Sequence, residues 1–221
     1  MKESIYTIPL TEVFEPKDGC PLCRLEDTLV ERTVEYIIGA AMMEPDIREE
    51  TNRKGFCKGH LEMMLPRKRK LAMALMLDTR MQELLDEFVK PENFDKKGSK
   101  YAPSPANSCF VCDQVEQVMK KMVDNIITRY DNDPEFAKLY ADQPCYCLKH
   151  FEQLGVRAYP VLGRKKAPEF IKATAAITRK NLEELQNDLK EMQLAFDYRN
   201  SGKPVSEQAK NAVERTVEFL G

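Results

Sequence analysis

The chain has 221 residues, with 34 basic against 36 acidic side chains and a formal net charge of −2. This balance excludes a protein drawn to nucleic acid or anionic lipid by bulk charge. The length allows one large domain or two small ones, and it is sufficient to bury a core without the help of a metal. Any metal site therefore has to be argued from its own residues.

The N-terminal stretch MKESIYTIPLTEVFEPKDG contains acidic residues and lacks the apolar segment of an export signal. The longest strongly apolar run, Leu71 to Leu77, is too short to span a bilayer. We therefore expect a cytoplasmic protein without a membrane segment. Disulfides are disfavoured in that compartment, so clustered cysteines indicate metal or redox chemistry.

The first half of the chain opens on a CxxC motif and continues as a series of predicted helices. An apolar stripe of helical period follows the motif, and Glu44-Pro45 then predicts the start of a short helix. A CxxH motif comes next, and a further helix is marked by Leu71, Leu75, Leu84, Leu85 and Phe88. The motif residues are Cys20, Cys23, Cys57 and His60, and the first stripe is Leu25, Leu29, Val34, Ile37, Ile38 and Ala41.

A Pro-, Ser- and Lys-containing stretch at 91–108 predicts a linker, after which the same order of elements recurs. Asp133-Pro134 predicts the second short helix. Asn200-Ser201-Gly202 predicts the turn that ends a long helix, and Pro204 the start of a last helix ending near Leu220. The second motif residues are Cys109, Cys112, Cys147 and His150, the stripe is Val115, Val118, Met119, Met122, Ile126 and Tyr130, and the long helix is marked by Phe170, Ile177, Leu185, Leu189, Met192 and Phe196.

These matched halves predict a duplicated, mostly α protein. Thirty-three residues lie between Cys23 and Cys57, and thirty-four between Cys112 and Cys147. An offset of 89 or 90 residues superimposes the motifs, with a single insertion in the second copy. We expect a first zinc-binding repeat at 1–90, the linker at 91–108, and at 109–221 a second repeat with the C-terminal helices.

The donor set of each half suits one zinc ion. Zinc favours a tetrahedron of thiolate and imidazole ligands, and a CxxH motif at a helix start places its sulfur and imidazole one turn apart on the same face. We expect each CxxC to join the CxxH of its own half, so that each chain carries two closed Cys3His sites. Four protein ligands leave no position for water or substrate, so such sites are structural.

Three other interpretations of the cysteines stay open. They could hold iron–sulfur clusters, which more often use four Cys; they could be redox CxxC pairs; or they could be buried thiols. Cys145 aligns with Gly55 in the first half and is expected to be a spare thiol. A four-thiolate site of Cys145, Cys147, Cys109 and Cys112 is the alternative.

The chain resembles a bacterial family known as domain of unknown function 6062. The opening MKESIYTIPLTEVFE, the CPLC motif, the stretch EPDIREETNRKGFCKGH and the second CxxC…CxxH carry the resemblance, which covers nearly the whole chain. It implies a clostridia-like source and supports metal ligation by all eight motif residues. Members sometimes carry a transporter solute-binding label, but we expect no such role here because no export signal or lipid-anchor Cys is visible.

Three functions are compatible with these features. The first is a zinc-stabilised interaction module, whose partner is a protein, a second copy bound through the C-terminal helices, or, with less support, nucleic acid contacted by the basic runs at 67–70 and 164–166. The second is a redox-responsive regulator that releases zinc on thiol oxidation. The third is an enzyme, for which no nucleophile–base pair or cofactor motif is found, although Asp, Glu or Lys chemistry stays open.

Overall fold

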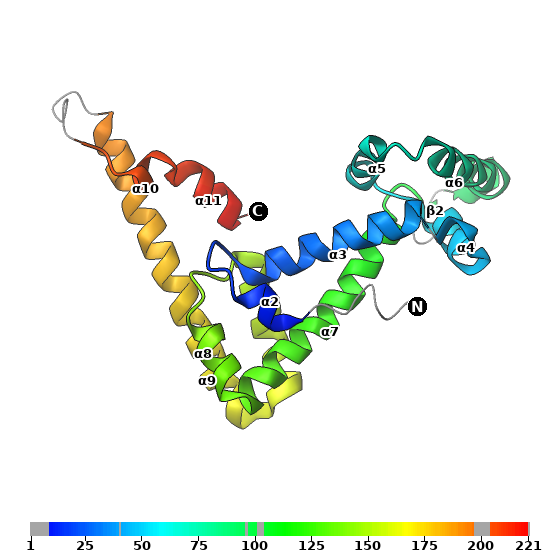
Figure 1. Ribbon diagram of the computed structural model, residues 1–221. Helices are drawn as coiled ribbons and strands as arrows, with labels where there is room; N and C mark the ends of the chain where they lie inside the picture. Colours follow the sequence, from blue (N-terminus) through cyan, green and yellow to red (C-terminus); the bar gives the residue numbers. More distant parts are fainter. Residues whose placement is uncertain (1–8, 40, 96, 101–103, 197–203, 221) are drawn as a thin grey trace. The chain divides into compact units, whose positions relative to one another are not determined.

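The structure is a computed structural model, and it describes residues 9–39, 41–95, 97–100, 104–196 and 204–220. The protein is mostly α, as predicted (Figure 1). No helix in these ranges is both long and apolar enough to cross a membrane. The elements up to the centre of the chain are α2 (Leu10–Phe14), α3 (Pro21–Ile38), η1 (Ala41–Met43), α4 (Pro45–Lys54), α5 (Lys58–Met64), η2 (Leu65–Arg67), α6 (Lys70–Glu83) and η3 (Leu84–Phe88).

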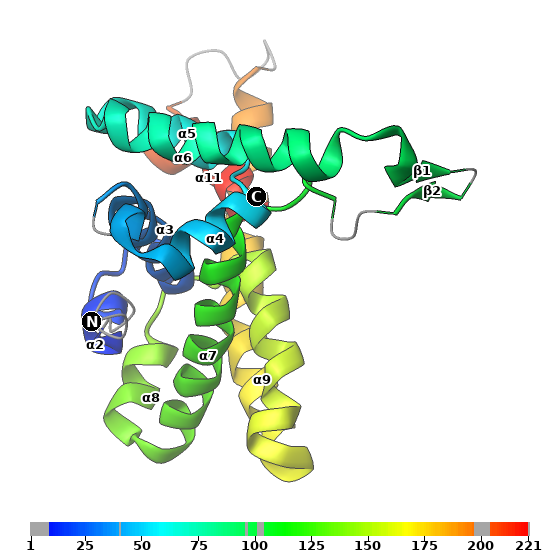
Figure 2. The same ribbon diagram turned by 90° about the vertical axis from the view of Figure 1, so that its right-hand side faces the viewer.

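The remaining elements begin in the expected linker. A single turn and a two-stranded antiparallel hairpin come first, with Phe94 paired to Ser99, and they follow the end of α6 and η3 (Figure 2). The sequence predicted no strand at this place. The elements are η4 (Pro91–Asn93), β1 (Phe94–Asp95), β2 (Gly98–Ser99), α7 (Phe110–Asn132), α8 (Pro134–Ala141), α9 (Leu148–Ala195), α10 (Glu207–Lys210) and α11 (Ala212–Leu220).

The chain forms two compact units that interleave along the sequence. Of the described residues, unit 1 holds 26–119, and unit 2 holds 9–25 together with 120–220. The first turn of α3 therefore belongs to unit 2 and its remainder to unit 1, whereas α7 starts in unit 1 and ends in unit 2. The two units thus differ from the expected halves at 1–90 and 109–221.

Unit 1 is built from α3, α4, α5, α6 and the start of α7. The α3 stripe predicted from Leu25 to Ala41 is buried throughout, and α4 starts at Pro45 and packs against α6. The prediction of which residues are buried in α6 and η3 is wrong. Leu71 and Leu75 of α6 and Leu85 of η3 are exposed, and the buried face of α6 consists of Ala72, Met73, Met76 and Arg80. Flexible Met side chains fill this core where the sequence pattern favoured Leu.

Unit 2 has an aromatic core contributed by four of its helices and the loop before α9. Tyr140 is completely buried, and its ring lies 4.7 Å from that of Tyr146 and 5.5 Å from that of Phe170. Its hydroxyl lies 2.8 Å from the Thr174 hydroxyl. Buried aromatic hydroxyls are stable only with such partners. The rings belong to Phe14, Tyr130, Phe136, Tyr140, Tyr146 and Phe170.

Helix α9 is interrupted at Gly163, which has φ 72° and ψ 177°, a backbone conformation that essentially only glycine adopts. The two parts of the helix lie side by side, since the Thr178 hydroxyl donates to the carbonyl oxygen of Tyr146 at 3.3 Å. The sequence markers starting at Phe170 predicted only the second part. That part continues to Ala195, and the predicted turn at Asn200–Gly202 lies outside the described residues.

The last helices pack against the second part of α9 (Figure 1). They start later than Pro204 predicted, because Ser206 caps α10 by accepting a hydrogen bond from the Ala209 N–H at 3.1 Å. A Ser side chain supplies the acceptor that a helix N-terminus needs, which Pro cannot do.

The backbone at Gly163 can be tested with alanine. Because nothing lies within 4 Å of the added Cβ at Gly163 or at Gly155 inside the same helix, a difference between the two variants reports backbone conformation alone. We expect Gly163→Ala to lower the free energy of unfolding by about 1–3 kcal/mol. Gly155→Ala should leave it unchanged or raise it by up to about 1 kcal/mol. Equal effects in urea denaturation would contradict the assigned turn.

Candidate metal centres

All four cysteine motifs lie at helix N-termini. The first Cys of each motif precedes its helix, and its carbonyl oxygen accepts the backbone N–H four residues later. The second ligand of each motif therefore lies in the first helical turn. The helices start inside the two CxxC motifs, whereas the apolar stripes predicted from the sequence begin only after these motifs. The partial positive charge of a helix N-terminus favours the thiolate form of such cysteines.

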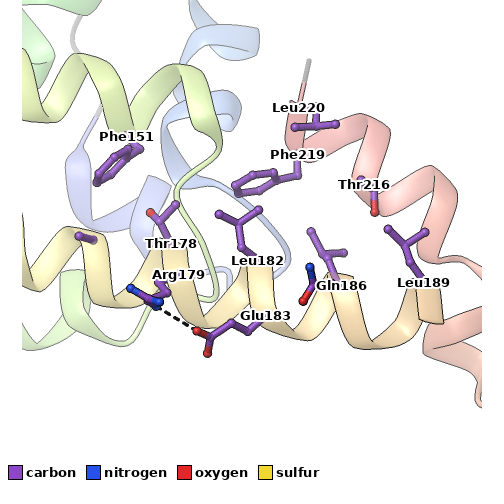
Figure 3. A pocket seen from close by; sticks show the side chains of 12 residues that line it. Phe151, Thr178, Arg179, Leu182, Glu183, Gln186, Leu189, Thr216, Phe219 and Leu220 are labelled. Carbon is purple, nitrogen blue, oxygen red and sulfur yellow. Dashed lines mark hydrogen bonds and ion pairs between the residues drawn. The ribbon is translucent and has the colours of Figure 1, made fainter. Parts of the chain in front are cut away.

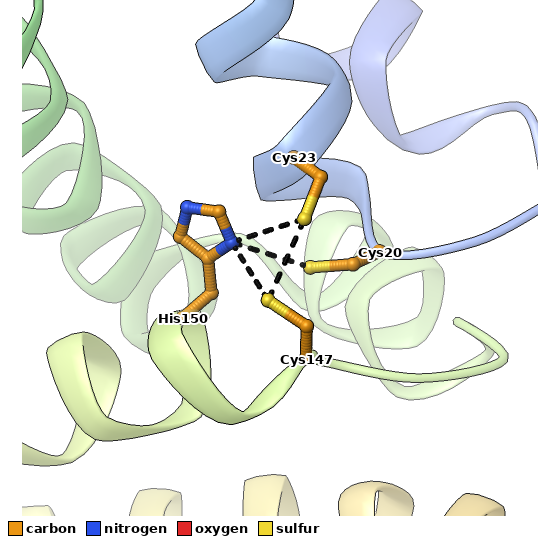
Figure 4. Close-up of side chains that lie close together, drawn as sticks. All are labelled: Cys20, Cys23, Cys147 and His150. Carbon is orange, nitrogen blue, oxygen red and sulfur yellow. Dashed lines mark hydrogen bonds between the residues drawn. The ribbon is translucent and has the colours of Figure 1, made fainter. Parts of the chain in front are cut away.

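The first group, called here the Cys20 cluster, consists of Cys20, Cys23, Cys147 and His150, and all of it lies in unit 2. Figure 4 shows the three sulfurs converging on one edge of the His150 ring. Nδ1 of His150 lies 3.6, 3.4 and 3.1 Å from the sulfurs of Cys20, Cys23 and Cys147. The Cys23 and Cys147 sulfurs are 3.5 Å apart.

The second group, the Cys57 cluster, consists of Cys57, His60, Cys109 and Cys112, and it lies in unit 1. Nδ1 of His60 lies 3.2, 3.3 and 3.5 Å from the sulfurs of Cys57, Cys109 and Cys112. The Cys57 and Cys112 sulfurs are 4.0 Å apart. Both clusters therefore have the same donor atoms in nearly the same arrangement.

The pairing of motifs differs from the one expected. Each CxxC joins the CxxH of the opposite half, so Cys20 and Cys23 meet His150 rather than His60. The expected pairing within each half is wrong, although the same eight residues gather. Spacing could not decide this, because a CxxC motif offers the same two sulfurs to either CxxH.

Cys145 belongs to neither cluster, so the alternative four-thiolate site is also wrong. Burial, reinforced by negative charge at Cys20 and Cys147, raises the pKa of Cys145 to about 12. This thiol is therefore protonated at neutral pH. Its counterpart Gly55 has φ 67°, a conformation in which a Cys side chain would be strained, so the two halves differ in backbone at this position.

The spacing of the donors fits a single tetrahedral ion. Bonds of about 2.3 Å to sulfur and 2.0 Å to nitrogen give tetrahedral edges of about 3.8 Å between sulfurs and 3.5 Å between sulfur and nitrogen. The sulfur–nitrogen distances of 3.1–3.6 Å and sulfur–sulfur distances of 3.5 and 4.0 Å agree with these edges. An iron–sulfur cluster places several metal atoms between its ligands and needs wider spacing.

The thiols of one cluster cannot all ionise in the absence of a cation. Hydrogen bonds from Cys20 and Cys23 hold the pKa of Cys147 well below its usual range, whereas the bond to Cys147 raises the pKa of Cys23. In the other cluster, burial first and then Cys109 raise the pKa of Cys112 to about 12. A bound divalent ion supplies the positive charge that lets all three thiols of a site ionise.

The aromatic core of unit 2 positions the Cys20 cluster. Tyr146, which directly precedes Cys147, donates its hydroxyl to the Tyr140 carbonyl oxygen at 2.9 Å, and its own carbonyl is held by Thr178. On the opposite side of the cluster, an Arg24 N–H donates to the carbonyl oxygen of Val13 at 2.5 Å. Both helix N-termini are therefore fixed by groups outside the cluster.

The end of α4 positions the Cys57 cluster. Gly55 accepts the backbone N–H of Phe110 at 2.9 Å, which joins the segment before α5 directly to the start of α7. Ser108 donates to the Lys54 carbonyl oxygen at 2.6 Å. The buried Arg80 donates to the carbonyl oxygens of Asn52 and Arg53 at the C-terminus of α4. Sequence reasoning missed Arg80, because a charged residue in a leucine-rich helix predicts exposure.

Comparison with known protein families gives a match over the whole chain. A family model described as "Family of unknown function (DUF6062)" matches residues 1–221. No curated protein and no solved structure matches. The description names no source, so the bacterial origin expected from the sequence stays a prediction.

The crossed pairing predicts which double variants keep a metal ion. Cys23→Ser with Cys147→Ser damages only the Cys20 cluster, so the chain should retain about one ion. Cys23→Ser with Cys57→Ser damages both clusters and should leave close to none. Metal per chain is measured by mass spectrometry after dialysis, with Cys145→Ser as the control that keeps the wild-type content. The opposite result for the two double variants would restore pairing within each half.

Proposed function

Because the chain belongs over its whole length to a family of unknown function, DUF6062, we propose from its geometry that it is a zinc protein whose two structural Cys3His sites stabilise a helical interaction module. The observation that carries the proposal is that three sulfurs and one imidazole nitrogen lie within 4.8 Å of one another in each cluster. Zinc is the ion that such closed tetrahedral sets of soft and borderline ligands typically hold.

Structural roles suit these sites better than catalytic ones. Each tetrahedron is filled by protein ligands, whereas catalytic zinc keeps a position for water or substrate. Both histidines of the chain belong to the clusters, which leaves no imidazole elsewhere as a general base. Each ion would also cross-link segments far apart in sequence, 124 residues in the case of Cys23 and Cys147.

The cysteine chemistry supports a reducing compartment. All seven cysteines are free thiols. Thiolate metal sites persist where disulfides do not form, so we retain the cytoplasm as the proposed location. We also retain duplication of a metal module as the proposed origin of the two halves, because all four motifs have the same arrangement at a helix N-terminus.

Neither nucleic-acid binding nor redox regulation gains an observation in its favour. In the basic run at 67–70, Arg67 forms ion pairs with Glu31 and Glu35, and Lys166 of the second run pairs with Asp131. These pairs neutralise charge that a phosphate backbone would need. The proposed resolving thiol of a redox switch, Cys145, is protonated at neutral pH, and thiols in that form react slowly.

The interaction surface that we propose is an apolar groove between α9 and α11. Its volume is about 680 Å³, and Figure 3 shows Phe151, Leu182 and Phe219 among the side chains around it. Helix α11 also exposes an apolar stripe at one-turn spacing formed by Val213, Val217 and Leu220, of which Leu220 lines the groove as well. Exposed apolar patches of this kind mark contact sites.

The occupant we propose is a second copy of the chain. Helix α11 of each copy carries the exposed stripe and also forms one wall of the groove. A twofold axis would therefore place the stripe of each copy in the groove of its partner. At the α9 edge of the groove, Arg179 and Glu183 form an ion pair with each other at 2.9 Å, and an antiparallel copy would exchange it for two pairs across the twofold axis. This proposed contact is one form of the homodimer through the C-terminal helices that the sequence predicts.

Metal removal tests the zinc proposal. The purified protein should contain two zinc ions per chain, and exhaustive chelation should lower the free energy of unfolding by about 5 kcal/mol or more, or roughly 10–20 °C in Tm. Circular dichroism measures the loss, and readdition of zinc is the control that restores the original Tm. A protein shown to be metal-free that keeps its full Tm would contradict a structural role.

The dimer surface has a matched pair of substitutions. Val217 on the α11 stripe and Val156 on α9 are both 65% exposed, so a Glu at either position costs little in folding. We expect Val217→Glu to weaken self-association at least tenfold and Val156→Glu to leave it unchanged, measured by sedimentation equilibrium. A wild-type chain that stays monomeric at millimolar concentration would contradict the proposed dimer surface.

A further inference from the structure

The two clusters differ in how far their ligands are exposed to solvent. In the Cys20 cluster, Cys20 is 8%, Cys147 5% and His150 0% exposed, and only Cys23 is half-buried. In the Cys57 cluster only Cys109 is buried, at 4%, while Cys57 and His60 are half-buried and Cys112 is exposed. Identical donor sets therefore lie in different surroundings.

From this contrast we infer that the Cys57 cluster is an exchangeable metal site, whereas the Cys20 cluster retains its ion. The inference rests on the proposed zinc function and adds a division of labour between its two sites. One site would stabilise the fold at all times. The other would load and unload a divalent thiophilic cation in response to its free concentration or to competing ligands.

The chemical step is ligand exchange without redox change. An incoming donor, such as a small thiol or a chelator nitrogen, approaches the ion and forms a new bond while the bond from the metal to Cys112 breaks. The released thiolate takes a proton from solvent. Because Cys112 is at the surface on the first turn of α7, its side chain can turn into water as it leaves.

The same step is hindered in the Cys20 cluster. His150 and Cys147 are enclosed by the protein, and Cys147 follows directly on Tyr146, whose ring is part of the fully buried aromatic core. Only Cys23 is partly open to a chelator, and the other ligands can leave the ion only when the protein around them opens locally. Release from this site is therefore slower than from the Cys57 cluster, whose Cys112 is exposed.

The residues next to the Cys57 cluster are charged and exposed to solvent rather than apolar. Lys58 follows Cys57 and is 89% exposed in its ion pair with Glu62. On the opposite side, Asp113 follows Cys112 and pairs with Lys54 at 2.8 Å, with 42% of the Asp113 side chain exposed. Water and small solutes therefore reach this cluster along both ligand-bearing helices.

Loss of the ion would loosen a specific element. The cluster attaches the first turn of α5 to the first turn of α7. Without metal, Gly55 stays bonded to Phe110 and Lys54 to Ser108, and α6 stays packed on α4. The N-terminal end of α5, which carries both Cys57 and His60, is thus the part whose attachment depends on the metal. The C-terminal end stays held by the buried Met64 and by the ion pairs of Arg67 with α3.

Release kinetics test the inference on the full-length zinc-loaded protein. Mixed with excess 4-(2-pyridylazo)resorcinol, the protein should release one zinc per chain at least ten times faster than the other. The matched variants are Cys112→Ser and Cys23→Ser, which change the second cysteine of each CxxC motif. Cys112→Ser should abolish the fast phase and Cys23→Ser the slow one, and hydrogen exchange should show α5 losing protection first.

Each result decides a different claim. Equal release rates for the two ions in the wild-type protein would overturn the inference and leave the zinc function standing. A fast phase that survives Cys112→Ser but disappears in Cys23→Ser would reverse the assignment of the two sites. A chain that binds no zinc on direct titration would remove the proposed function itself, together with the inference.

Discussion

The structure depends on one constraint: each cysteine pair meets the CxxH motif of the opposite half of the chain. The Cys57 cluster, whose ligands are 49 to 55 residues apart between motifs, is nested in sequence inside the Cys20 cluster, which joins segments 124 to 130 residues apart. The interleaving of the two compact units follows from this nesting, because each unit has to contain all four ligands of its own cluster.

Four helix N-termini contribute to the electrostatics of the two clusters. Each motif lies at a helix N-terminus, so two such termini face each cluster and offer partial positive charge to its thiols. That charge is not enough for three thiolates, as the raised pKa values of Cys23 and Cys112 show. A bound divalent ion would complete the balance, and its removal would return protons to the cluster.

Sequence patterns predicted the helical class, the helix starts at the two CxxH motifs and the buried stripe of α3, because these depend on local spacing. They failed where the outcome depends on distant partners. The exposed Leu71 and the buried Arg80 are set by how α6 packs on α4, and the break at Gly163 by the antiparallel packing of α9 on itself. The pairing of the motifs is the clearest example of this failure, since the nearly equal spacings in the two halves make both pairings equally compatible with the sequence.

X-ray diffraction at the zinc absorption edge tests the central claim most directly. Crystals of the zinc-loaded protein should show two anomalous peaks per chain. One should be bonded to Cys20, Cys23, Cys147 and His150, and the other to Cys57, His60, Cys109 and Cys112. Peaks whose four ligands come from a single half of the chain, or the absence of any peak at either cluster, would contradict it.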